Sequence, residues 1–251
     1  MSDIGDWYKR IPFFTKWWLT LTVVLSLAGR IGLVQPYQMI LLYSNVIHKF
    51  EIWRLISALF YYPVNPQTGF HFLVNCYFLY NYSLRLETGE FEGRPADYIF
   101  MLIINWTCCS LIALTIELPL LMDCMVLSIL YVWCQLNKDT IVTFWFGTTF
   151  KAMYLPWVFF AFNFIIAGGG ISELIGILAG HMYYFLKYTH PQEYGVQSYL
   201  RTPSFLYNWF PSRRIAGGFG VPPSRSSATA DQSNTGRHNW GRGRVLGGDV
   251  D

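Results

Sequence analysis

The longest stretch without a charged side chain runs from Leu55 to Leu84, and further uncharged stretches follow it along the chain. A helix that crosses the hydrocarbon core of a bilayer needs about 20 mostly apolar residues, because each residue rises by only about 1.5 Å. Uncharged segments of this length, repeated along one chain, therefore predict a protein that crosses the membrane several times.

The composition points the same way. Hydrophobic residues make up 53% of the 251 residues and charged residues only 13%, whereas soluble globular chains carry about 25% charged residues. The five cysteines lie in apolar stretches, at spacings that suit neither a metal site nor a secreted disulfide framework. We therefore expect buried free thiols, and we expect no metal, no cofactor and no nucleic-acid partner.

The apolar segments predict an all-α bundle of six spans, with a segment at Leu55–Tyr62 that dips into the membrane and is stopped by Pro63. The predicted spans are about Trp17–Val34, Phe70–Tyr82, Tyr98–Ile116, Leu118–Leu136, Tyr154–Ala167 and Ile171–Leu186. This gives an N-terminal cytosolic segment over residues 1–16, a membrane domain over 17–188 and a tail over 189–251.

Lysine and arginine residues orient the predicted bundle. With six spans and a cytosolic N-terminus, 15 of the 18 basic residues lie in cytosolic segments, and only Arg30, Lys49 and Arg54 lie on the luminal side. Because cytosolic loops carry an excess of these residues, both termini are expected in the cytosol. A cleaved signal peptide is the alternative for the first span, but the Trp17-Trp18 pair favours a retained helix with an interfacial anchor.

The character of the sequence changes from about Thr189. Pro, Gly, Ser and Arg dominate, and residues 224–237 (SRSSATADQSNTGR) have no apolar periodicity. Such a segment cannot bury enough apolar surface to fold, which predicts a disordered tail. Two aromatic islands interrupt it, at residues 204–210 and 238–248. The first is expected either to lie on the membrane surface or to finish the sixth helix.

Trp53 and Arg54 stand together at the entrance of the dipping segment. In one interpretation, Arg54 anchors the loop by reaching lipid headgroups. In the other, Trp53 wedges the loop into the bilayer surface while Arg54 bonds backbone carbonyls inside the protein. The second is favoured, because irregular backbone survives at membrane depth only where it is buried in protein or lines water.

The sixth predicted span contains Gly176 and Gly180, four residues apart. Two glycines at this spacing open a flat helix face that another helix can approach closely. Polar side chains are costly at membrane depth and usually face a protein interior or a wet cavity. We therefore expect Asn75, Asn163 and His181 to lie in a membrane-depth polar groove, with His181 as a hydrogen-bonded interior group.

These residues carry a family resemblance. Trp53-Arg54 in the first luminal loop, with GxxxG in the sixth span, resembles the rhomboid superfamily. The stretches RLETGEFEGRPADYIFMLIINW (residues 85–106), LYVWCQLNKD and FWFGTTFKAMYLPW resemble its derlin branch, and the resemblance extends from MSDIGDW at the start to GRHNWG near the end. It implies an endoplasmic-reticulum membrane factor that helps to move misfolded proteins to the cytosol for proteasomal destruction.

The resemblance also bears on catalysis. Active rhomboids cleave with a serine in a Gly-x-Ser-Gly turn on the fourth span and a histidine on the sixth. Here Leu127 and Ile129 flank Ser128, and the position three residues before the first GxxxG glycine is Glu173, expected at the luminal interface. We therefore expect a pseudoprotease that is not an enzyme. An intramembrane serine protease with a Ser128–His181 dyad is the alternative.

Without catalysis, the predicted fold is expected to act on the bilayer. The apolar parts of the fifth and sixth spans, Tyr154–Ala167 and Leu174–Leu186, give roughly 20 Å each, against a hydrocarbon core about 30 Å thick. Short apolar lengths can thin the bilayer locally. Thinning beside a polar groove would lower the barrier that polar segments meet when they cross.

Residues 240–247 (WGRGRVLG) resemble the SHP box, which binds the N-domain of the valosin-containing AAA ATPase. In this comparison Trp240 and Leu246 fill pockets, while Gly241 and Gly243 let the backbone lie flat on the partner. The usual box places its aromatic two residues before the first glycine, whereas Trp240 directly precedes Gly241. The family resemblance implies further partners: a membrane-embedded ubiquitin ligase complex, misfolded substrates, the lipid bilayer and other derlin copies.

Two other classes of protein are alternatives. A pure ATPase-recruiting adaptor would need only an anchor and the tail, so Trp53 and Gly176 would be dispensable. A channel or transporter is disfavoured because the sequence has neither repeated halves nor repeated charge-lined spans.

Overall fold

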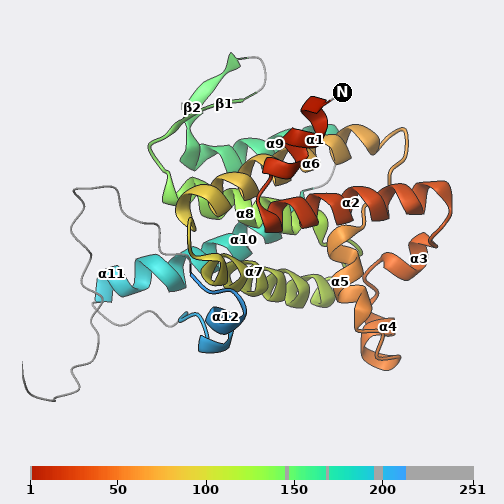
Figure 1. The fold of residues 1–251 in the computed structure, drawn as a ribbon. Helices are drawn as coiled ribbons and strands as arrows, with labels where there is room; N and C mark the ends of the chain where they lie inside the picture. Colours follow the sequence, from red (N-terminus) through yellow and green to blue (C-terminus); the bar gives the residue numbers. More distant parts are fainter. Residues whose placement is uncertain (1, 145–146, 168–169, 195–199, 213–251) are drawn as a thin grey trace, which may run out of the picture. The chain divides into compact units, whose positions relative to one another are not determined.

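The computed structural model describes residues 2–144, 147–167, 170–194 and 200–212 (Figure 1). A helix lies at the place of each predicted span, and a short helix, α5 (Trp53–Phe60), lies at the predicted dipping segment. The bounds of the six longer helices are α2 (Phe13–Ile31), α6 (Gly69–Arg85), α7 (Pro95–Thr115), α8 (Met122–Leu136), α9 (Leu155–Ala167) and α10 (Ile171–Tyr184).

Shorter elements fill the connections. A π-helical turn, η1 (Leu86–Glu90), follows α6, and a second, η4 (Phe185–Thr189), joins α10 to α11 (His190–Tyr194) in one continuous run of helical backbone. The other short elements are α1 (Ser2–Arg10), α3 (Pro36–Met39), α4 (Tyr43–His48), the 3₁₀ turn η3 (Ala152–Tyr154) and α12 (Ser204–Trp209).

The six longer helices of the described part of the chain are not equally suited to cross a membrane. Among the described residues, only α7 combines sufficient length, 21 residues, with sufficient hydropathy. The apolar helices Met122–Leu136 and Ala152–Ile165 are shorter. In α6, side chains such as His71, Asn75 and Asn81 interrupt the apolar sequence. Length and composition thus identify one clear span, and the count of six depends on the pattern along the chain.

The prediction of an all-α fold is wrong in one respect. Strands β1 (Ile141–Thr143) and β2 (Thr149–Lys151) form an antiparallel hairpin between α8 and α9. The β-branched residues of the first strand favour extended backbone. An ion pair of 2.9 Å between Lys151 Nζ and Asp139 joins the base of the hairpin.

Helix α8 is the centre of the fold. Twelve of its 15 residues are buried, and it packs against α6, α7, α9 and α10, most extensively against α10. A helix that is apolar all round must be covered on every side. The surrounding helices, by contrast, expose large apolar side chains on their outer faces, among them Leu73 of α6, Ile165 of α9 and Leu178 of α10.

A polar network fastens the start of α2. Glu87 in η1 accepts hydrogen bonds from the backbone N–H groups of Phe14 (3.1 Å) and Thr15 (2.9 Å) and from the Thr15 hydroxyl (2.8 Å). The Thr15 hydroxyl also contacts that of Ser83, which contacts the Tyr98 hydroxyl. Because the first turn of a helix leaves its N–H groups unpaired, the Glu87 carboxylate both satisfies them and complements the helix dipole.

Part of the tail expected to begin at residue 189 packs on the membrane domain. Helix α12, from the first aromatic island of the tail, packs on α7: Leu206 is buried against Ala96, and the rings of Phe210 and Phe14 lie 5.4 Å apart (Figure 1). The apolar side chains of this island therefore pack on the membrane domain.

We predict that Glu87→Ala destabilises the fold by about 1–3 kcal/mol, because it leaves buried or partly buried donors at the start of α2 without an acceptor. The measurement is thermal or denaturant unfolding of the detergent-solubilised chain. Thr88→Ala is the matched control, since Thr88 is exposed and its hydroxyl bonds only the Leu84 carbonyl. Equal stability of the two variants would contradict the prediction.

Candidate functional site

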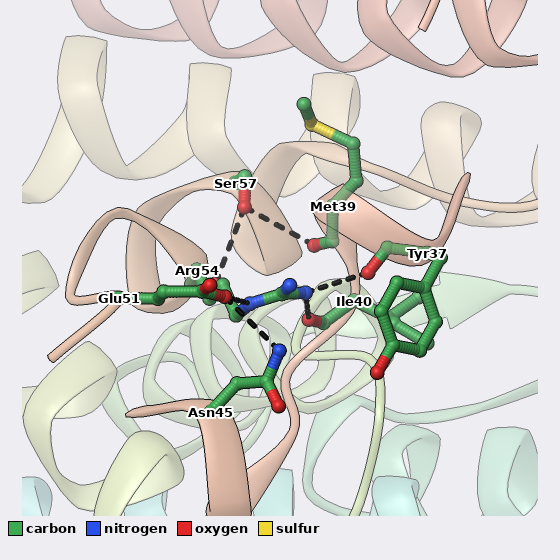
Figure 2. A network of polar contacts seen from close by, with 7 residues as sticks. All are labelled: Tyr37, Met39, Ile40, Asn45, Glu51, Arg54 and Ser57. Carbon is green, nitrogen blue, oxygen red and sulfur yellow. Dashed lines mark hydrogen bonds and ion pairs between the residues drawn. The ribbon is translucent and has the colours of Figure 1, made fainter. Parts of the chain in front are cut away.

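Arg54 lies at the centre of a polar network in the loop between α2 and α6 (Figure 2). It is only 3% exposed. Its Nη1 donates to the backbone carbonyls of Tyr37 (2.6 Å) and Ile40 (3.0 Å), and its Nε donates to the Glu51 carboxylate (2.5 Å). The guanidinium also lies over the Tyr37 ring, 5.4 Å from its centroid. One side chain of α5 thus joins the segment around α3 and the residue Glu51.

Neighbouring side chains complete the network. Asn45 donates to the Glu51 carboxylate at 3.1 Å, and the Ser57 hydroxyl donates to the Met39 carbonyl at 3.1 Å (Figure 2). The hydrogen bond from Arg54 holds the pKa of Glu51 below its ordinary value, so the carboxylate stays charged at neutral pH. We call this set of residues, Tyr37, Met39, Ile40, Asn45, Glu51, Arg54 and Ser57, the loop brace.

Trp53 points the other way. It is 57% exposed, whereas Arg54, the next residue, is buried. Successive residues of a helix lie on different faces, so α5 turns one side towards the loop brace and presents Trp53 and Ile56 outwards. The loop therefore has a fixed interior and an apolar exterior.

Gly176 and Gly180 bring α10 directly onto α8. A Cβ added at Gly176 would clash with the backbone carbonyl oxygen of Cys124, and one added at Gly180 would lie 2.7 Å from the carbonyl oxygen of Ser128. Backbone atoms cannot move aside as a flexible side chain can. The two glycines therefore permit a separation between the helices that any other residue would prevent.

Asn75 and Asn163 lie in one buried polar cluster. Asn75 Nδ2 donates to the Asp123 carboxylate at 2.5 Å, and Asn163 Nδ2 donates to Glu173 at 3.0 Å. His71 links the two pairs, with Nε2 at 3.8 Å from Glu173 Oε1. The residues of this polar cluster are Tyr62, His71, Asn75, Asp123, Asn163 and Glu173.

Sequence reasoning did not assign His71 or Asp123 to a site. Glu173, expected at the luminal interface, is buried in the polar cluster. A signal was available, because Asp123 is an acidic residue inside a predicted span, where a charged group usually marks a partner or a site. Its partner could not be found from sequence, since Asn75 lies 48 positions away.

His181 is not brought together with the two asparagines. It lies towards the other end of α10, where its Nδ1 is 2.7 Å from the Tyr131 hydroxyl. It also lines an apolar cavity of about 400 Å³ with Cys108 of α7 and Phe185 of η4. Its side chain is exposed rather than interior.

Ser128 and His181 are engaged with other partners. The Ser128 hydroxyl is fully buried and donates to the Met125 carbonyl within its own helix, at 2.8 Å. His181 contacts Tyr131. A serine nucleophile needs an exposed hydroxyl and a base within hydrogen-bond reach, and in this arrangement Ser128 has neither.

The proposed ATPase-binding residues Trp240, Gly241, Gly243 and Leu246 lie outside the described residues. The geometry of the candidate site is therefore that of the loop brace, the α8–α10 contact and the polar cluster, together with the exposed Trp53.

Comparison with known proteins identifies the family of the chain. Residues 11–204 match the model of the Der1-like family, a range that contains the loop brace, both glycines and the polar cluster. Derlin-1 of Homo sapiens is 54% identical over 249 residues, which cover 98% of this chain and 99% of the relative. Derlin-1 of Caenorhabditis elegans is 46% identical over 248 residues, with the same coverage.

A more distant relative is also similar. The probable derlin-2 homolog of Dictyostelium discoideum is 35% identical over 214 residues, 81% of each chain. Membership of this family is consistent with membrane association and with a role in endoplasmic-reticulum-associated degradation. By the family match and by similarity over nearly its whole length, the chain belongs to the Der1-like family, the derlins.

Proposed function

We propose that this chain is a non-catalytic factor of endoplasmic-reticulum-associated degradation that helps to retrotranslocate misfolded luminal and membrane proteins to the cytosol. It would do so from six spans in the endoplasmic-reticulum membrane, with both termini cytosolic. The observation that carries the proposal is the similarity to Derlin-1 over 98% of the chain, within which a braced loop presents an exposed tryptophan.

The distribution of polar and apolar surface supports the membrane part of the proposal. Large apolar side chains are exposed along α2, α6, α9 and α10, and soluble monomers rarely expose so much apolar surface. In Figure 1 the loop helices α3, α4 and α5 lie at one end of α2 and α7, and the hairpin and α11 lie at the other. This separation suits a luminal loop and a cytosolic side rich in Lys and Arg.

The mechanism is local thinning of the bilayer. Helix α9 has 13 residues and α10 has 14, roughly 20 Å each, against a core about 30 Å thick. Helical backbone continues beyond α10 through η4, but Lys187 ends its apolar part. The buried polar cluster lies beside this short apolar length, and Trp53 extends from the loop brace to disturb lipid and to meet substrate.

The absence of catalysis is part of the proposal. The burial of Ser128 and its bond to the Met125 carbonyl support it, as does the pairing of His181 with Tyr131. The alternative, a Ser128–His181 protease, is tested with a fluorophosphonate probe. Labelling of the wild type that Ser128→Ala abolishes would establish the protease and reject the non-catalytic proposal.

Driving force would come from partners. We propose that Trp240, Gly241, Gly243 and Leu246 recruit the valosin-containing AAA ATPase, and that the membrane domain works with a membrane-embedded ubiquitin ligase complex and with other derlin copies. Thinning would lower the barrier that the substrate meets in the bilayer, whereas ATP hydrolysis would drive its movement towards the cytosol.

Two substitutions distinguish a translocation factor from a pure adaptor. Trp53→Ala and Gly176→Ala, each with the tail intact, are expected to slow clearance of a luminal misfolded substrate, because one removes the exposed wedge and the other forces α10 away from α8. Clearance is followed by pulse-chase. Gly69→Ala is the matched control, since nothing lies within 4 Å of an added Cβ there. Normal clearance by both test variants would favour the adaptor.

Lengthening the apolar part of the sixth helix tests whether the bilayer is thinned. Four leucines inserted after Leu186 add about one helical turn, roughly 6 Å, and so lengthen the apolar part of the helix. We expect slower clearance of the same substrate, because the bilayer would no longer be thinned beside α10. Four glutamines at the same place give the same length without the apolar extension. If the leucine and glutamine variants clear substrate equally well, thinning is not the mechanism.

Deletion of the C-terminal residues tests whether the tail recruits the ATPase. Deletion of Asn239–Asp251 is expected to abolish co-purification of the valosin-containing ATPase while leaving membrane insertion and the stability of the membrane domain unchanged. Trp240→Ala should act in the same direction, because it empties one of the two apolar pockets. Undiminished co-purification after the deletion would contradict the assignment of the tail.

A further inference from the structure

A second polar site lies away from the loop brace and the polar cluster. A cavity of about 340 Å³ lies where the start of α7, the turn η4 and the segment before α12 meet. The first of these elements contributes Arg94 and Asp97, η4 contributes Lys187, and the segment before α12 contributes Arg201 and Thr202.

Positive charge exceeds negative charge in the cavity wall. Arg94, Lys187 and Arg201 line it, and Asp97 is the single acidic residue among the lining residues. The Asp97 carboxylate is already occupied: one oxygen accepts hydrogen bonds from the hydroxyls of Thr202 (2.5 Å) and Tyr207 (2.7 Å), and the other lies 4.0 Å from Arg94 Nη1. This carboxylate is therefore shared between two hydroxyl donors and a distant guanidinium.

Within the described part of the chain, Lys187 and Arg94 donate hydrogen bonds to neutral oxygens. Lys187 Nζ donates to the Leu200 carbonyl at 2.7 Å, and Arg94 Nη2 donates to the Glu90 carbonyl at 2.6 Å. Burial lowers the pKa of Lys187, and the charge of Arg94 acts in the same direction, although Asp97 opposes both. An anion placed among these groups would relieve their mutual repulsion.

The position in the fold selects the kind of anion. The apolar part of the sixth helix ends at Leu186, one residue before Lys187, so in the proposed orientation the cavity lies at the level of the cytosolic headgroups. Phe91 and Tyr188 complete the wall with aromatic surface. Basic pockets between membrane helices on the cytosolic side suit lipid phosphates, and the positive end of the α7 dipole adds to the attraction.

We propose that this cavity, lined by Arg94, Lys187 and Arg201, binds the phosphate group of an anionic lipid, such as a phosphatidylinositol phosphate, in the cytosolic leaflet. The bound headgroup would join α7, η4 and the segment before α12, and so fasten the start of the tail to the membrane domain. The level of the cavity rests on the proposed orientation, whereas its affinity for phosphate does not.

The test uses the full chain in phosphatidylcholine nanodiscs, with or without a phosphatidylinositol phosphate, and native mass spectrometry to measure retained lipid. Arg201→Gln and Lys187→Gln are each expected to weaken retention about fivefold. Arg201 is exposed, and Lys187→Arg should retain the lipid. Lys151→Gln is the matched control, because it removes a cation from the hairpin instead.

A soluble inositol phosphate, added to nanodiscs of phosphatidylcholine alone, separates the two sources of phosphate. If native mass spectrometry shows stronger retention of the lipid than of the soluble compound, the lipid assignment is supported. Equal retention of the two identifies a soluble phosphate ester and overturns the lipid assignment. Equal lipid retention by Arg201→Gln, Lys187→Gln and Lys151→Gln would overturn the site altogether. Neither result depends on substrate clearance, so failure here is distinct from failure of the proposed function.

Discussion

The close contact of α8 and α10 at Gly176 and Gly180 is the packing constraint on which the enclosure of α8 depends. Because a Cβ at either position would meet backbone atoms of α8, the two helices are held together without intervening side chains. This encloses α8 and buries the Ser128 hydroxyl against its own helix. The packing that makes the bundle compact thus removes the exposure that a serine nucleophile requires.

A second constraint acts on the loop outside the bundle. Arg54 supplies donors to two backbone carbonyls and a carboxylate, which lets irregular backbone persist without unpaired polar groups. The braced loop holds Trp53, the residue next to Arg54, on its exposed side. This arrangement fits the proposed role of Trp53 as a wedge in the bilayer surface.

Sequence reasoning located the helices because long apolar segments determine them locally. It could place Gly176 on a packing face but could not name Cys124 and Ser128 as what the face meets. Glu87 as a cap for α2 and the pairing of Asn75 with Asp123 join positions 72 and 48 residues apart, and no local pattern encodes them. The hairpin and the docking of α12 were missed because short apolar segments between charged residues look like loop.

Four charged groups of the membrane domain lie at helix ends. Asp123 and Glu173 lie in the first turns of α8 and α10, where the helix dipole favours negative charge. Arg94 and Lys187 lie where α7 begins and where the apolar part of α10 ends. Helices α7 and α8 run in succession through a short turn, so these groups occupy opposite ends of the bundle. The position of Asp123 and Glu173 at one end and of Arg94 and Lys187 at the other, with short apolar helices between, fits the proposed action on the bilayer.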